Sequence, residues 1–338
     1  MPVVIKPLLA DRREEALSFI QPYESECVNL AAEILRGGTD CWLVLYSEQL
    51  QAQDARGNFL QAQEGAAADQ EASQTETLAG VIALRKKRSL FFCLPFAKYK
   101  SASDKKVCNE AQRPLADFFE SNEPFCVNGE AAGALYIKNI LRHKKTPMQS
   151  SVVNKYYLMA SDGEALQAQD AGGNFLQAQE GAAQNCEVFN ALNAGGGLRV
   201  MQATAVDCDR LLPLELGYQR EEVVPQSFDI SDAALAAAFK HELGQGLTFA
   251  LYDGDRPIAK ARIAASGQRY CMIGGVYTIP QERKKGRAAF LVSQIIKRSQ
   301  TGGICGFSLY AKQENAAAFA LYKKLGFTPR GEYLLVYY

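Results

Sequence analysis

An 18-residue phrase stands almost unchanged at two places in the chain, 50–67 and 166–183, with a single difference between Arg56 and Gly172. The sequences that flank the two copies are dissimilar. The repeats of a solenoid, in contrast, adjoin one another and share a hydrophobic pattern without being identical in sequence. Glutamine, alanine, glycine and acidic residues dominate the phrase, so it offers little apolar surface to bury. The phrase therefore argues against a solenoid and predicts a globular chain that carries two insertions.

Both copies follow runs that are typical of strands. The first lies between CWLVLYSE at 41–48 and LAGVIAL at 78–84, and the second follows YYLM at 156–159. Insertions are tolerated best where strands end and loops begin, because doubling the length of a loop adds only about 0.6 kcal/mol of closure entropy. We expect both copies to be tolerated insertions at permissive loops; a duplicated binding arm is the alternative.

The length and charge of the chain limit its class. Its 338 residues exceed a typical domain, so two domains are expected. Equal numbers of basic and acidic residues, 37 of each, give no sign of a nucleic-acid or anionic-membrane partner. The N-terminus becomes charged before a signal-peptide core can form, and no run approaches the roughly 20 apolar residues that span a bilayer. We expect a cytoplasmic protein that binds neither membrane nor nucleic acid.

Cysteine and histidine usage argues against a metal site. The nine cysteines are scattered and form no CxxC pair, so neither a disulfide framework nor a zinc site is expected. His143 and His241 are the only histidines, which disfavours a Ser-His-Asp hydrolase and a histidine-rich zinc site. The sequence predicts a reducing environment and no metal cofactor.

A basic loop and an amphipathic helix share residues 280–303. Before this segment we expect a strand at 198–204, a helix at 205–223, a hairpin at 247–265 and a strand at 269–279. Gly274 and Gly275 interrupt the last strand and indicate a bulge or a close backbone approach. The basic loop contains Arg283, Lys284, Lys285, Gly286 and Arg287. A helix N-terminus offers unpaired N–H groups and a positive dipole end, Gly286 permits close backbone approach, and Ala288 leaves room above the first turn. By itself such a loop is usually a solvated helix cap; a diphosphate site is the alternative, and the motif that follows favours it.

A second motif follows a predicted strand at 306–311. Residues 312–327, KQENAAAFALYKKLGF, form a helix that begins near Asn315 and stops at Gly326. The two motifs in this order resemble the GNAT superfamily of acyl-CoA-dependent N-acetyltransferases. The family signature Arg/Gln-x-x-Gly-x-Gly/Ala is met by Arg283, Gly286 and Ala288, and Asn-x-x-Ala-x-x-Leu-Tyr-x-Lys-x-Gly-Phe is met from Asn315 to Phe327. The resemblance spans about 198–338.

The resemblance implies an α/β fold with a central twisted, mostly antiparallel sheet flanked by helices, and acetyl-CoA as co-substrate. Val276 and Thr278 would offer backbone groups to the pantetheine arm, and the Val276 N–H would polarise the acetyl carbonyl. Tyr322 would protonate the departing thiolate, with a core aromatic as the alternative interpretation. By the same resemblance the cofactor would contact Arg283, Lys284, Lys285, Gly286, Arg287, Ala288, Asn315 and Ala318 besides Tyr322.

The base that deprotonates the acceptor amine is not evident from the sequence. Family members often carry a carboxylate on the strand before the loop, yet 269–279 contains none. Glu221 and Glu222 are candidates by position, although we favour a solvated helix end for both.

The N-terminal half resembles the same family more faintly. A helical pattern at 11–38 precedes strands at 41–48, 78–84 and 89–96. The segment 125–141 resembles the Asn-led helix: Leu135, Tyr136 and Lys138 match it, whereas Gly129 replaces Asn315 and Ile140 replaces Gly326. The basic stretch after the third strand lacks a glycine. We interpret this half as a degenerate second GNAT-like domain.

The sequence therefore predicts two GNAT-like domains, a degenerate one at 1–160 with an insert at about 49–77 and a catalytic one at 198–338, joined by a linker at 161–197. The predicted function is acetyl transfer from acetyl-CoA to a primary amine by direct attack in a ternary complex; the acceptor, a small molecule or a protein amine, stays open. A non-catalytic acyl-CoA-binding or regulatory protein is the main alternative. An aminoacyl-tRNA-dependent transferase is a weaker one, because it needs a basic RNA-binding surface and no CoA site.

Overall fold

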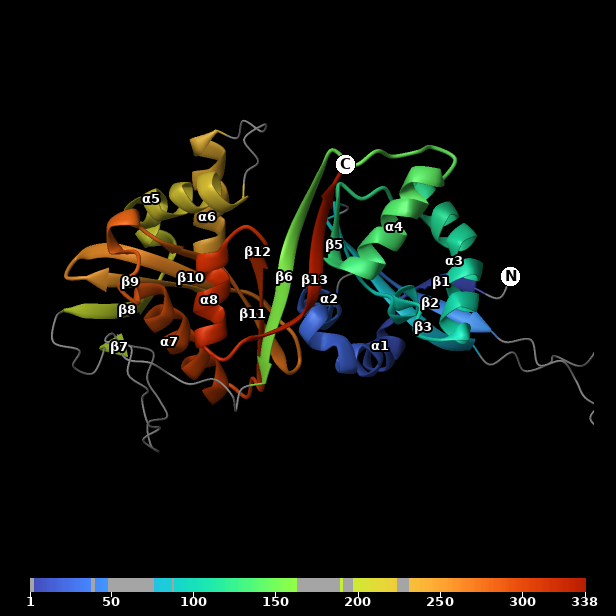
Figure 1. Ribbon diagram of the computed structural model, residues 1–338, viewed down its shortest axis with the longest axis horizontal. Helices are drawn as coiled ribbons and strands as arrows, with labels where there is room; N and C mark the ends of the chain where they lie inside the picture. The colour runs from blue at the N-terminus through green and yellow to red at the C-terminus, as the bar shows by residue number, and fades with distance from the viewer. Residues whose placement is uncertain are drawn as a thin grey trace, which may run out of the picture. The chain divides into compact units, whose positions relative to one another are not determined.

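The computed structural model describes residues 3–37, 40–47, 76–86, 88–162, 189–190, 197–223 and 231–338. These residues form two compact units (Figure 1): the first contains Met1–Tyr23, Glu33–Asn154 and Leu334–Tyr338, and the second contains Glu24–Ala32 and Lys155–Tyr333. Both copies of the repeated phrase lie outside the described residues, so their role as passengers stays a prediction.

The first unit is a mixed, mostly antiparallel sheet with helices packed against it, as predicted. Its strands follow the order β1-β2-β3-β4-β5, and of the four pairings described between them only that of β4 with β5 is parallel. Its elements are β1 (Val3–Pro7), α1 (Arg13–Ile20), β2 (Cys41–Ser47), β3 (Glu76–Arg85), β4 (Ser89–Cys93), α3 (Ala102–Ser121), β5 (Cys126–Glu130) and α4 (Ala131–His143). The predicted helix at 11–38 is interrupted: the 3-10 turn η2 (Gln21–Glu26) separates α1 from α2 (Val28–Leu35). Pro22 explains the break, since proline lacks the N–H that a continuous helix needs.

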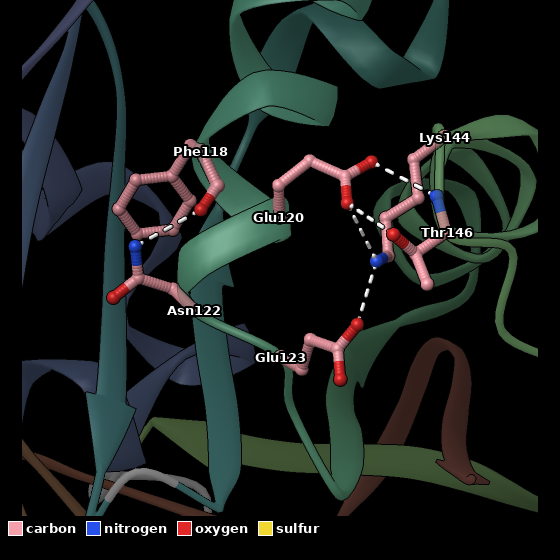
Figure 2. Close-up of polar contacts among 6 residues, drawn as sticks. All are labelled: Phe118, Glu120, Asn122, Glu123, Lys144 and Thr146. Carbon is pink, nitrogen blue, oxygen red and sulfur yellow. Dashed lines mark hydrogen bonds and ion pairs between the residues drawn. The ribbon is translucent and has the colours of Figure 1, made fainter.

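Helices α3 and α4 of the first unit lie side by side (Figure 1) and are tied together at one end by a buried lysine. The Lys144 ammonium is fully buried and lies 2.6 Å from Glu123 Oε1 and 3.4 Å from Glu120 Oε2 (Figure 2). The Thr146 hydroxyl donates to the same Glu120 carboxylate at 2.8 Å. These contacts join the end of α3 to the chain that follows α4.

The second unit repeats this order of elements. From β6 its strands run β6-β12-β11-β10-β9-β8-β7, and only β11 and β12 pair in parallel among the described pairs. Its elements are β6 (Val152–Asp162), β7 (Phe189–Asn190), β8 (Leu198–Gln202), α5 (Cys208–Tyr218), η6 (Gln219–Val223), α6 (Asp232–Leu243), β9 (Thr248–Asp253), β10 (Arg256–Ser266), β11 (Tyr270–Thr278), η7 (Pro280–Glu282), α7 (Arg287–Thr301), β12 (Gly306–Lys312), α8 (Ala316–Lys324) and β13 (Thr328–Tyr337). The start of β6, up to Asn154, and the end of β13, from Leu334, belong to the first unit. The α5–η6 segment is the helix predicted at 205–223, but its last turn, η6, is a π-helix.

Alternation along β9 places helices on both faces of this sheet. Phe249 and Leu251 pack in one cluster with side chains of α7, whereas Ala250 and Tyr252 pack in another with side chains of α5 and α6. Successive side chains of a strand point to opposite faces, so α7 and the α5–α6 pair cover opposite sides. A third cluster combines residues of α7 and α8 with β11 and β12, so α8 lies on the α7 side.

The parallel strands β11 and β12 separate half-way along their length. They pair only from Tyr270–Gly306 to Ile273–Leu309; beyond this point β12 stays paired with β6 and β11 with β10. A bulge sits where they part, because Lys260 pairs with Tyr277 but Arg262 pairs with Gly274, which leaves an extra residue on β11. Gly275 adopts a φ of 61° there. The bulge predicted from the two glycines is therefore present.

Candidate active site

A pocket of about 400 Å³ opens within the second unit at the point where β11 has left β12. It is lined from the end of β11, the loop and first turn of α7, the start of α8 and the π-helical turn η6. The predicted site residues that line it are Val276, Thr278, Arg283, Lys284, Gly286, Arg287, Ala288, Asn315, Ala318 and Tyr322. The structure thus brings together two motifs that lie about 30 residues apart in the sequence. Of the predicted residues only Lys285 is not part of the lining.

The start of α7 exposes its backbone to the pocket. Gly286 is the N-cap of this helix with a φ of 74°, and Lys284 before it also has a positive φ, 62°. The first N–H groups of a helix have no partner within it, and a glycine N-cap has no side chain to accept from them. A left-handed N-cap disfavours residues with a Cβ, which favours glycine at this position. The result is a turn of N–H groups beside Arg283 and Arg287, which suits a phosphate group.

The backbone at the end of β11 points into the opening. The Ile279 N–H donates to the Ile258 carbonyl on the β10 side at 3.0 Å. Because backbone groups alternate in direction along a strand, the N–H groups of Thr278 and Val276 point away from β10. The Thr278 carbonyl is occupied, since Arg283 Nε donates to it at 3.0 Å. Of the two predicted pantetheine contacts, Val276 and Thr278, the N–H groups are therefore the ones oriented toward a ligand.

Asn315 and Tyr322 face the same pocket from α8. The Asn315 side chain accepts a hydrogen bond from the Ala318 N–H at 2.9 Å and so caps the helix. Tyr322 is 6% exposed and packs against Phe327, with ring centroids 6.0 Å apart. Burial raises the pKa of the Tyr322 hydroxyl, and Tyr218 and Glu222 raise it further, so the phenol stays protonated at neutral pH. Tyr322 is therefore both a packing aromatic and a part of the pocket wall, and its role as a proton donor stays a prediction.

Residues 213–327 match the sequence profile of the Acetyltransferase (GNAT) family. The second unit carries a GNAT acetyltransferase domain. The match contains both motifs and every residue that lines the pocket. No match was found among curated protein sequences.

Solved structures resemble the chain at low sequence identity. A protein of the GNAT family from Novosphingobium aromaticivorans is 17% identical, with a TM-score of 0.37, over 56% of this chain and 65% of that chain. A predicted acetyltransferase from Clostridium acetobutylicum, solved with acetyl-CoA, is 22% identical, with a TM-score of 0.33, over 39% of this chain and 90% of that chain. A Drosophila protein is 11% identical, with a TM-score of 0.54, over 99% of this chain and 98% of that chain. The last match shows the same fold along nearly the whole chain.

Two glutamates of the π-helical turn η6 reach the pocket of the GNAT domain. Glu221 accepts from the Tyr277 hydroxyl at 2.9 Å and from Arg283 Nη2 at 2.7 Å. Glu222 is half-buried and accepts from Asn315 Nδ2 at 3.0 Å. Burial raises the pKa of Glu222, and Glu221 raises it further, against the opposing effects of Lys312, Asn315 and Arg283. Both residues line the pocket. The interpretation as a solvated helix end holds for the exposed Glu221 but not for Glu222, which is half-buried and bonded to Asn315.

The position of these glutamates depends on a local irregularity of the helix. A π-turn inserts an extra residue per turn and re-aims the side chains that follow it, and such turns are frequent at functional sites. The contact of Glu222 with Asn315 joins residues 93 positions apart. Spacing along the sequence carries no sign of either feature.

Two basic residues of the loop in the GNAT domain pair with Glu282, and they differ in whether they line the pocket. Glu282 accepts from Lys285 Nζ at 3.0 Å and from Arg287 Nε at 3.2 Å, and these two bonds lower the pKa of its carboxyl. Lys285 is half-exposed and turned to Glu282, which leaves it outside the lining. Glu282 itself lines the pocket and was not predicted.

No group of three or more histidine, cysteine, aspartate or glutamate side chains is placed to hold a metal ion within the described ranges. In the same ranges no helix is both long and apolar enough to cross a membrane.

Proposed function

We propose that the GNAT domain transfers an acetyl group from acetyl-CoA to a primary amine by direct attack in a ternary complex. The observation that carries the proposal is the convergence on one pocket of an uncapped helix start, an outward-facing Val276 N–H and the Tyr322 phenol. Diphosphate, thioester carbonyl and thiolate are the three parts of acetyl-CoA that need such partners. The co-substrate supplies an activated acetyl thioester.

The pocket residues divide the work of binding and catalysis. The N–H groups that follow Gly286 would hold the diphosphate, with Arg283 and Arg287 adding positive charge. The Val276 N–H would donate a hydrogen bond to the thioester oxygen and stabilise the negative charge that develops there. The fit is chemical: donors and cations line the end of the pocket where a diphosphate would lie, and the lining beside Val276 includes Leu321 and Ala318.

Proton transfer would use two ionisable groups that line the pocket, Glu222 and Tyr322. An alkylammonium with a pKa near 10 must lose a proton before it attacks. Glu222 would receive this proton, since its raised pKa makes it a stronger base than an ordinary glutamate. Tyr322 would give a proton to the departing thiolate. Glu222, held by the Asn315 side-chain amide, would supply the carboxylate that β11 lacks.

The acceptor is proposed to be an amine of a small molecule or of a protein, in the cytoplasm, with neither nucleic acid nor membrane as partner. A non-catalytic acyl-CoA-binding protein is the competing proposal, and it differs only in turnover.

Calorimetric titration of the full chain with acetyl-CoA, with CoA as a second ligand, tests the proposal first. We expect saturable binding near one site per chain, followed by acetyl transfer in a screen of primary amines. Binding without transfer to any amine would favour the non-catalytic protein. The absence of binding would overturn both and would direct attention to aminoacyl-tRNA.

A further inference from the structure

A buried lysine lies directly behind the bulge of β11. Lys260 of β10 is 1% exposed, and its ammonium lies 2.7 Å from Glu215 Oε2 on α5. It also stands 4.4 Å from the centre of the Tyr218 ring. Its third contact is with the backbone: Lys260 Nζ donates to the Gly275 carbonyl at 3.1 Å. Arg262 and Glu242, which pair with each other, are the other charged groups that act on it.

This arrangement is costly for a purely structural purpose. Burial lowers the pKa of Lys260, while Glu215 opposes the change. Replacing a buried ion pair by apolar side chains of similar volume is often neutral or stabilising, so such a pair is weak support for a fold by itself. None of the proposed binding and proton-transfer steps involves Lys260 or Glu215.

The contact with Gly275 reaches the pocket through a single peptide group. The Gly275 carbonyl and the Val276 N–H belong to the same planar trans amide, so they point in opposite directions. An ammonium that donates to the oxygen polarises the amide and strengthens its N–H as a donor. The carbonyl points to Lys260, and the N–H therefore points away from it, in agreement with the strand alternation that aims Val276 outward.

The backbone conformation of the bulge depends on the same contact. Gly275 has a φ of 61°, and a Cβ at this position would lie 3.4 Å from Lys260 Nζ and 3.3 Å from the Arg262 side chain. An irregular strand segment with a positive φ leaves backbone groups that the sheet does not satisfy. Lys260 supplies the partner for one of them from behind the sheet.

We propose that Lys260 is a positioning residue for acetyl transfer: its ammonium fixes the Gly275–Val276 peptide and polarises the Val276 N–H toward the thioester carbonyl. The inference rests on the proposed function. Lys260 touches no substrate and acts through one amide, with the Glu215 carboxylate at 2.7 Å as its counter-charge.

The test uses two variants, because Lys260→Met alone leaves Glu215 buried without its partner. The double variant Lys260→Met/Glu215→Leu removes both charges and keeps an apolar filling of similar volume. We expect kcat to fall by about three- to tenfold in both variants and the Kd for acetyl-CoA to stay unchanged. This loss is smaller than the roughly hundredfold loss that follows removal of a whole oxyanion donor. The matched control is Lys144→Met, which removes the buried lysine of the first unit and is expected to lower stability without changing kcat.

A spectroscopic measurement separates polarisation from general loosening. The infrared carbonyl band of acetyl-CoA, labelled with carbon-13 at the thioester, reports the strength of the hydrogen bond it accepts. In the double variant the band of the bound ligand should move to higher wavenumber, and in Lys144→Met it should not move. An unchanged band and an unchanged kcat in a folded double variant would overturn the role of Lys260 while leaving the acetyltransferase proposal intact. If the unaltered protein fails to bind acetyl-CoA, the proposed function fails and the inference fails with it.

Discussion

The two units follow one order of elements, but they differ at the end of the parallel strand pair, which is open in the second unit and filled in the first. Each has an antiparallel hairpin, a strand, a long helix, a second strand parallel to the first, and a further helix: β2–β3, β4, α3, β5 and α4 in the first unit, and β9–β10, β11, α7, β12 and α8 in the second. In the second unit a pocket opens between the parallel strands and the helices. In the first unit the Phe92 ring fills the corresponding space, since a Cβ at Gly129 or Gly133 would lie 2.1 Å or 2.3 Å from it.

The starts of the two long helices differ in the same sense. In the first unit the Ser101 hydroxyl accepts from the Asp104 N–H at 3.0 Å and the Asp104 carboxylate accepts from the Ser101 N–H, so the start of α3 is capped from within. In the second unit Gly286 leaves the start of α7 uncapped by its own side chain. The matching tyrosines diverge too: Tyr136 donates to the Cys108 carbonyl at 2.6 Å, whereas Tyr322 lines the pocket. One scaffold thus satisfies its polar groups internally or leaves them for a ligand.

The largest expected effect comes from removing the filler. Phe92→Ala should destabilise the first unit by about 3–5 kcal/mol through the cavity it leaves. It should not create a second acetyl-CoA site, because the start of α3 stays capped by Ser101. Denaturant unfolding measures the first expectation, and calorimetric stoichiometry measures the second. Two sites per chain in the variant would show that the Phe92 ring alone keeps the first unit from binding acetyl-CoA.

Gly286→Glu should weaken acetyl-CoA binding at least a hundredfold without unfolding the second unit. The new side chain strains a left-handed position and sets a carboxylate where a diphosphate is expected, and such like-charge contacts cost several kcal/mol. Calorimetry measures the affinity, and circular dichroism checks the fold. Ser101→Glu, at the capped helix of the first unit, is the matched control and should leave the affinity unchanged. Equal affinities of Gly286→Glu and the unaltered protein would remove the α7 turn from the site.

Tyr322→Phe should lower kcat about a hundredfold and leave the Kd for acetyl-CoA unchanged, because a general acid contributes roughly 10²-fold or more to the chemical step alone. Tyr136→Phe is the control from the other unit. It loses one buried hydrogen bond, worth about 1 kcal/mol of stability, and should keep full activity. Normal turnover of Tyr322→Phe would leave this residue with a packing role only.

Glu222→Gln should lower kcat/KM by about a hundredfold at pH 7, with a smaller loss as pH rises and more of the free amine forms without help. The base must be ionised to act, so activity of the unaltered protein falls as pH drops through the Glu222 pKa. Because burial raises that pKa, the acidic limb should lie above the ordinary glutamate value of about 4.3. A pH–rate profile shows both effects. A limb that persists in Glu222→Gln would assign the proton transfer to another group.

The smallest effect is expected from the repeated phrase. Deleting 50–67, which lies between the paired strands β2 and β3, should change stability by less than about 1 kcal/mol, since long loops cost little more than short ones. Activity should stay within about twofold. Thermal unfolding and an acetyl-transfer assay check this, and a large loss of either would support a duplicated binding arm.

The parts of the site that follow from short-range rules could be predicted from the sequence. The glycine loop before α7 and the Asn-led start of α8 are local patterns, and both reach the pocket. Glu222 could not be assigned, because its position depends on the π-turn and on a contact with Asn315 far along the chain. The burial of Lys260 could not be predicted either. A lysine within a strand is expected to face solvent, and only the packing of α5 on that face of the sheet buries it.

The boundaries between the units were the hardest feature to anticipate. The predicted division at 160 and 198 follows the order of the chain, yet Glu24–Ala32 belongs to the second unit and Leu334–Tyr338 to the first. Val28 and Ala32 pack with Ala265 and Met272 of the second unit. The burial of a few apolar side chains determines to which unit such a short segment belongs, and the order of the sequence does not indicate it.

The placement of Leu334–Tyr338 has a consequence for biosynthesis. Leu334 and Val336 are buried in the core of the first unit, and the Tyr338 N–H donates to the Phe125 carbonyl at 3.0 Å. A chain emerging from the ribosome can therefore not finish the first unit until the whole of the second has been translated. Folding of this protein cannot proceed strictly from one end to the other, and a fragment cut between the two halves leaves the first unit without part of its core.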